Sequence, residues 1–83
     1  MFFKIRNPNL EVMYPLVLQR FDALKENDNE KGNTYYALNI GDLSELLELD
    51  ALCRVTNGHY LGIKLSGMEL TLLETEYEFE RDL

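Results

Sequence analysis

The chain has few of the residues on which most catalytic and metal sites depend. Its 83 residues include one cysteine, Cys53, one histidine, His59, and no tryptophan. A single cysteine excludes an internal disulfide and is typical of a reducing compartment. No apolar run approaches the ~18 residues of a membrane span, and residues 1–9 lack the long apolar core of a signal peptide. We therefore expect a cytoplasmic protein.

The motifs of the common enzyme classes are absent as well. A nucleophilic site needs a nucleophile, a base and an orienting group, and neither Ser44 nor Ser66 has a histidine near it in sequence. Cys53 precedes His59 closely, but a cysteine within a predicted helix is usually a small buried apolar residue. No glycine-rich phosphate-binding loop is present. We predict that the protein is not an enzyme and expect no cofactor.

The net charge of −7 is distributed unevenly. Residues 1–41 hold five acidic and five basic residues, whereas residues 42–83 hold ten acidic and three basic ones. An acidic field repels nucleic acids and membrane surfaces and attracts basic proteins. We therefore expect a basic protein partner and no direct binding to nucleic acid or membrane; the alternative is that the charge serves solubility alone.

The apolar content of 46% is ordinary for a globular protein, and residues 1–83 are long enough for one domain. Alternating apolar residues predict strands at 2–6 and 34–40. Between these two strands, apolar residues at helical spacing predict a first helix. A polar stretch, 26–33, follows it, and we predict a surface loop there. Pro15 either opens this first helix, which we favour, or kinks a longer one that begins near Asn9. The helical pattern consists of Tyr14, Val17, Leu18, Phe21 and Leu24.

A second helix begins at a capping box, with Asp42 at the N-cap and Glu45 three residues on. Its end at Asn57-Gly58 is ambiguous, because Asn-Gly is also a strong hairpin signal. We favour a helix end with Gly58 in the left-handed conformation. The apolar face of this helix is predicted to consist of Leu43, Leu46, Leu47, Ala51 and Val55, with Asp50 interrupting it.

Residues 59–77 form the strongest pattern, a hairpin that turns at Ser66-Gly67. This turn pairs Leu65 with Met68, Ile63 with Leu70, Leu61 with Leu72, Lys64 with Glu69, and His59 with Glu74. Leu61, Ile63, Leu70 and Leu72 are therefore predicted core residues. The apolar phase changes after Leu72, so either a β-bulge lies near Leu72-Leu73 or the strand leaves the sheet as a tail. The resulting fold is α+β, with element order β-α-β-α-β-β, a mainly antiparallel sheet and two helices on one face.

Two sites follow from this register. His59 and Glu74 lie opposite each other, and Cys53 or Asp50 is near in sequence, which makes Cys53, His59 and Glu74 candidate zinc ligands. The alternative is a hydrogen bond between His59 and Glu74. From about residue 74 an acidic strand or tail begins, in which acids alternate with Thr75, Tyr77 and Phe79. The predicted partner-binding residues are Glu74, Glu76, Tyr77, Glu78, Phe79, Glu80 and Asp82.

In an extended strand these carboxylates stand ~6.6–6.8 Å apart, about half as dense as the phosphates along one DNA strand. The row therefore either imitates a phosphate backbone or keeps an exposed strand edge from aggregating. Small size, acidity, the lack of catalytic groups and the segment Glu76 to Asp82, EYEFERD, resemble small phage-encoded inhibitors such as anti-CRISPR and anti-restriction proteins. The resemblance implies a protein that occludes a basic, nucleic-acid-handling protein of a host. The alternatives are a structural homodimer that pairs through its C-terminal strand and a small zinc-binding protein.

Overall fold

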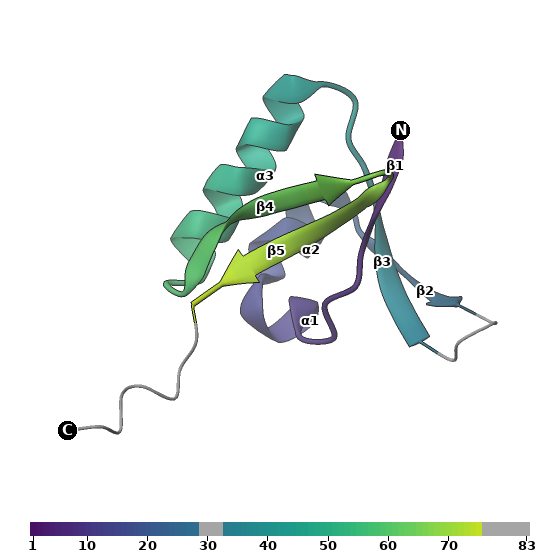
Figure 1. The fold of residues 1–83 in the computed structure, drawn as a ribbon, viewed down its shortest axis with the longest axis horizontal. Coiled ribbons are helices and arrows are strands. Elements are labelled where there is room, and N and C mark those ends of the chain that lie inside the picture. Colours follow the sequence, from purple (N-terminus) through teal and green to yellow (C-terminus); the bar gives the residue numbers. More distant parts are fainter. Residues whose placement is uncertain (29–32, 76–83) are drawn as a thin grey trace.

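The computed structural model describes residues 1–28 and 33–75 as one α+β domain, which confirms the predicted fold class (Figure 1). Its strand order is β2-β3-β1-β5-β4; β1 and β5 are parallel, and the other neighbours are antiparallel. The described part contains one more strand and one more helix than predicted. The elements are β1 (Phe2–Ile5), α1 (Leu10–Met13), α2 (Pro15–Phe21), β2 (Leu24–Asp28), β3 (Asn33–Asn39), α3 (Leu43–Thr56), β4 (Tyr60–Ser66) and β5 (Glu69–Glu74).

The additional strand, β2, corrects the prediction of a loop at residues 26–28 and of a helical position for Leu24. Asn33 begins β3, and residues 29–32 of the predicted loop over 26–33 lie outside the described residues. Pro15 opens α2, as favoured, but the helix ends at Phe21 because Asp22 adopts a left-handed conformation with φ of 51°. The chain then runs antiparallel to β3. As an edge strand with mostly exposed side chains, β2 needs no apolar alternation, so the sequence pattern did not reveal it.

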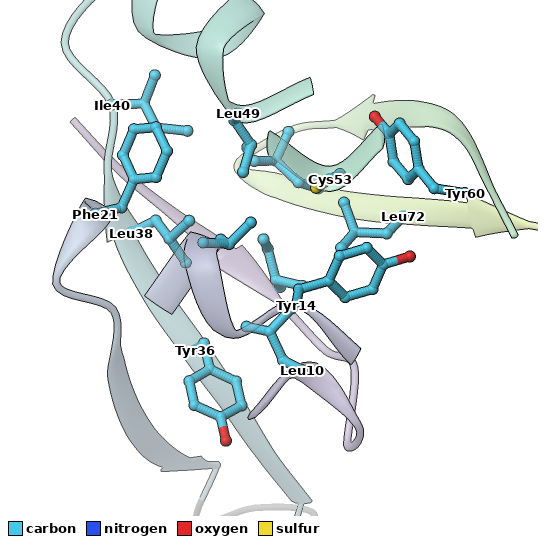
Figure 2. Packing of buried hydrophobic residues seen from close by; sticks show 13 residues of the cluster. Leu10, Tyr14, Phe21, Tyr36, Leu38, Ile40, Leu49, Cys53, Tyr60 and Leu72 are labelled. Atoms are coloured by element: carbon cyan, nitrogen blue, oxygen red, sulfur yellow. The ribbon is translucent and has the colours of Figure 1, made fainter. Parts of the chain in front are cut away.

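One core lies between the sheet and the helices (Figure 2). Phe3 and Ile5 face it from β1, and Tyr36 and Leu38 from β3, as their alternation predicted. Figure 2 shows the hydroxyl of Tyr36 directed away from the other labelled side chains. The fully buried side chains include Tyr14, Ile5, Leu10, Leu38, Leu49, Leu70, Val17 and Cys53.

Helix α3 packs with a different side than predicted. Leu49 and Cys53 are buried, whereas the expected core residues Leu43, Leu47, Ala51 and Val55 are exposed and Leu46 is half-buried. Leu49 and Cys53 are four residues apart, like the residues of the exposed stripe, and they lie on the opposite side of the helix. The helix therefore carries two apolar stripes, and the fold buries the one that the sequence analysis did not select.

The ends of α3 follow local rules only in part. Asp42 is the N-cap, as predicted: its Oδ1 accepts a hydrogen bond of 3.0 Å from the Glu45 amide, and Glu45 Oε1 accepts one of 2.6 Å from the Gly41 amide. The favoured helix end is confirmed, since α3 stops at Thr56. Its cap, however, is Asn57 in an extended conformation, and Gly58 has no positive φ. The prediction of a left-handed Gly58 is wrong.

The hairpin register differs from the prediction by two residues. Gly67, with φ of 61°, and Met68 form the turn, so that Ser66 lies opposite Glu69. A positive φ at the first central residue, followed by a residue without one, is typical of a type II′ turn. Leu65 therefore pairs with Leu70, Ile63 with Leu72, and Lys64 with Thr71. An even shift keeps every side chain on its predicted face, so the apolar face survives the error.

The sheet irregularity lies in β4 and not at Leu72-Leu73. The register shifts between Tyr60 and Gly62, which leaves Leu61 as the extra residue and 58% exposed. Tyr60 takes its place in the core and, in place of His59, lies opposite Glu74. The prediction of Leu61 as a core residue is therefore wrong, whereas Leu70 and Leu72 are buried as predicted and Ile63 is partly buried.

Candidate functional site: an apolar pocket beside the hairpin tip

Each of the three predicted zinc ligands has its own contacts. The Cys53 side chain is buried in the core, and Nδ1 of His59 lies 3.0 Å from Oγ1 of Thr75. Glu74 accepts hydrogen bonds from the Tyr14 hydroxyl and from the Asn57 amide. Within residues 1–28 and 33–75, no three histidine, cysteine or acidic side chains gather closely enough to hold a metal ion.

Tyr14, Asn57 and Glu74 form a polar cluster that closes the C-terminal end of α3 against the hairpin. Nδ2 of Asn57 donates to the Tyr14 hydroxyl at 2.9 Å and to Oε2 of Glu74 at 3.3 Å. Oδ1 of Asn57 accepts from the His59 amide at 3.0 Å. Because Tyr14 and Asn57 are buried, each polar group here needs its partner, and the cluster stabilises the fold.

The thiol of Cys53 lies in an environment that favours its protonated form. Burial, reinforced by the nearby Asp50 carboxylate, raises the pKa of Cys53 to about 12. Since the thiolate is the nucleophilic form of cysteine, this side chain acts as a buried apolar residue at neutral pH. Burial and the hydrogen bond to Glu74 likewise raise the pKa of Tyr14 above its usual value.

The predicted acidic row lies largely outside the described residues. Only Glu74 is described, and it shares the inward face of β5 with Leu70 and Leu72. Its carboxylate accepts hydrogen bonds from Tyr14 and Asn57 and is therefore not free to contact a partner. The residues outside the described ranges are Glu76, Tyr77, Glu78, Phe79, Glu80 and Asp82.

A mainly apolar cavity lies at the other end of α3, between the start of the helix, β1 and the hairpin. Its volume is about 210 Å³. Met1, Leu43 and Leu65 are exposed at its rim, whereas Ile40 and Leu70 are buried. This apolar pocket is lined by Met1, Phe3, Ile40, Gly41, Asp42, Leu43, Leu46, Leu65 and Leu70.

Two hydrogen bonds attach Met1 to the end of β3, beside the pocket. The N-terminal ammonium donates to Oδ1 of Asn39 at 2.7 Å, and the Ile40 amide donates to the Met1 carbonyl at 2.9 Å. Figure 1 shows the N-terminus beside the tip of the β4–β5 hairpin. This site was not predicted from the sequence, because Leu43 was assigned to the apolar face of the helix, Leu65 was given only Met68 as a cross-strand partner, and Met1 had no assigned role.

The pocket is suited to binding and carries little that could do chemistry. Apart from the N-terminal ammonium, Asp42 is its ionisable lining residue, and its carboxylate already caps α3. Apolar pockets with a few polar groups at the edge accept apolar side chains or small apolar ligands. Methionine at the rim adapts readily to such a partner.

The larger cavity beside Phe2, about 350 Å³, is lined by Arg20, Asp22 and Asn39 as well as by apolar residues. This mixed lining makes it a weaker candidate for an apolar anchor than the pocket beside Leu65. In the described residues, no helix is long and apolar enough to cross a membrane. Comparison of the chain with models of protein families, with curated protein sequences and with solved structures found no match.

Proposed function

We propose that this protein is a protein-binding module that occludes a basic surface of another protein, with the apolar pocket as its anchor. The supporting observation is an open apolar cavity with Met1, Leu43 and Leu65 exposed at its rim, in a chain of net charge −7. Buried apolar anchors supply most of the affinity of an interface. Surrounding charge contributes mainly to association rate and specificity.

An apolar pocket in an acidic chain fits a basic protein partner. We propose that this partner is a nucleic-acid-handling protein of a host, the kind of target that anti-CRISPR and anti-restriction inhibitors occlude. The described residues carry ten acidic and six basic side chains, a net charge of −4, and the remaining −3 lies in 29–32 and 76–83. The acids of 76–83 add the steering field in this proposal, and Tyr77 and Phe79 add further anchors. Such a protein acts by covering a site and needs no catalytic group.

The test is capture of a partner from a lysate of candidate host cells by two matched variants. Leu65→Ser changes a residue of the pocket lining. Leu61→Ser changes a leucine of the same strand that lies outside the pocket and has a similar exposed fraction, 58% against 51% for Leu65. We expect Leu65→Ser to abolish capture and Leu61→Ser to retain it.

Charge is tested separately by replacing Glu76, Glu78 and Glu80 with glutamine. We expect weaker capture and a flatter dependence on salt, because screening acts on exposed charges. Equal capture by both leucine variants, together with no effect of salt, would contradict the proposal.

A further inference from the structure

Helix α3 exposes an apolar ridge on the side opposite the core. Leu43, Leu47, Ala51 and Val55 follow one another at intervals of four residues, and all four are exposed. Leu47 and Val55 retain 61% and 74% of their accessible surface, while Leu49 and Cys53 retain none. We call these four residues the α3 ridge.

Such a ridge is unusual on a helix that is free in water. A helix with apolar residues on both sides is normally covered on both sides. Residues spaced by four also form the ridges that interlock when two helices pack at a crossing angle of about 50°. The α3 ridge thus has the geometry of a helix-packing surface and has no neighbour among the described residues that buries it.

We propose that a second copy of the chain covers this ridge, in a two-fold symmetric dimer whose α3 helices run antiparallel. A two-fold axis between Leu47 and Ala51 places Leu47 against Ala51 of the partner subunit, and Ala51 against Leu47 of the partner subunit. Each large side chain then meets a small one, which is the self-complementarity that an isologous interface requires. At a crossing angle of about 50° the two helices diverge toward Leu43 and Val55, so the contact centres on Leu47 and Ala51.

Charge also favours a second copy over a basic partner at this surface. The acidic side chains that flank the ridge are already paired within the chain. Arg20 binds Glu48 through two hydrogen bonds of 2.6 and 2.9 Å and lies 3.8 Å from Glu45. Asp50 accepts hydrogen bonds from Arg54 at 3.1 Å and from the Tyr60 hydroxyl at 2.5 Å.

These pairs reduce the repulsion that two chains of charge −7 experience when they meet at α3. A basic partner gains less here, because it would compete with Arg20 and Arg54 for the same carboxylates. The inference therefore goes beyond the proposed function and does not depend on it: the dimer contact centres on Leu47 and Ala51, whereas the apolar pocket borders α3 at Leu43 and Leu46.

The size of the ridge sets the expected strength of the dimer. A helix of 14 residues is about 21 Å long, and a single ridge from each copy buries less than the ~800 Å² per partner of a standard interface. We therefore expect a dimer that dissociates on dilution. Because the contact is apolar, it should respond little to salt.

Sedimentation velocity of the full chain over a wide concentration range tests the proposal. We expect a monomer–dimer equilibrium that Leu47→Glu weakens at least about tenfold in Kd. Leu61→Glu is the matched control, since it makes the same change at a leucine of similar exposure in β4, outside the α3 ridge, and it should leave Kd unchanged. A wild-type chain that stays monomeric at every concentration would overturn the proposal, and so would equal effects of the two variants.

A size exchange tests the two-fold pairing itself. Leu47→Ala alone should weaken the dimer, and adding Ala51→Leu should restore it, because each copy again presents one large and one small side chain at the paired positions. Melting temperatures of the variants should stay close to that of the wild type, since both positions are exposed. A double variant as weak as Leu47→Ala would exclude the antiparallel two-fold arrangement.

Discussion

The two ends of α3 meet the β4–β5 hairpin in different ways. At the C-terminal end, Tyr14, Asn57 and Glu74 close the contact with hydrogen bonds between groups that are inaccessible or half-buried. At the N-terminal end, Leu43 and Leu65 border a pocket of about 210 Å³. Buried polar groups need partners to fold at all, whereas exposed apolar surface is not needed for folding. The closed end therefore contributes stability, and the open end is the part available for binding.

We expect alkaline pH to lower the stability of the fold more than any of the substitutions below. Burial raises the pKa of Cys53 to about 12 and shifts the pKa values of Tyr14 and Tyr60 upward as well. Each group holds its proton more tightly in the folded chain, so its contribution to stability is full below its unfolded pKa. We expect stability to fall from about pH 9 upward, as first cysteine and then tyrosine titrates in the unfolded chain.

Denaturant unfolding followed by circular dichroism between pH 7 and 11 measures this loss. Cys53→Ala should move its onset upward, toward the ordinary pKa of tyrosine of about 10. Constant stability up to pH 11 would show that these groups are not buried as described.

Paired leucine truncations compare the two ends directly. Leu72 is 9% exposed and packs in the core, so Leu72→Ala should lower the free energy of unfolding by roughly 2–5 kcal/mol. Leu65→Ala at the open end should lower it by less than about 1 kcal/mol, because half of the side chain is already in water. Urea unfolding of both variants measures the difference, and equal losses would mean that the open end is packed as tightly as the closed end.

The polar cluster is tested by Asn57→Ala. Removing the amide leaves the buried Tyr14 hydroxyl without its donor and the His59 amide without its acceptor, which should cost about 1–3 kcal/mol. Asn39→Ala is the control near the open end; its Oδ1 accepts an exposed hydrogen bond from the N-terminal ammonium, so this change should cost less than Asn57→Ala. Thermal unfolding of both variants checks the order, and a larger loss at Asn39 would reverse the assignment of the two ends.

The smallest expected effect concerns the turn beside the open end. Gly67 has a positive φ with no atom near the position of an added Cβ, so Gly67→Ala is limited by backbone conformation alone. The positive φ that a type II′ turn requires at this position costs a residue with a Cβ roughly 1–3 kcal/mol. Gly62→Ala, which has open space and no positive φ, should be nearly neutral. Equal destabilisation of the two variants in urea would argue against the type II′ turn.

Local interactions explain the features of the fold that could be predicted from the sequence alone. The alternation in β1 and β3 selects their buried faces, and Asp42 with Glu45 defines the start of α3. The apolar face of the hairpin was also predictable, although its register was not. A shift of the strand pairing by two residues leaves the alternation of apolar and polar faces unchanged. In addition, Ser66-Gly67 and Gly67-Met68 could each form a two-residue turn that contains the same glycine.

Contacts between distant residues decided the rest. The two apolar stripes of α3 are equivalent in sequence, and only the packing against Tyr14 and the sheet selects Leu49 and Cys53 for the core. Strand β2 forms because β3 offers it an edge, and the hydrogen bond from Tyr14 to Glu74 joins residues 60 positions apart. Such contacts depend on which surfaces meet after the chain has closed, and that information is absent from any local pattern. The exposed α3 ridge and the apolar pocket both result from this choice, because both are apolar surfaces that the fold leaves uncovered.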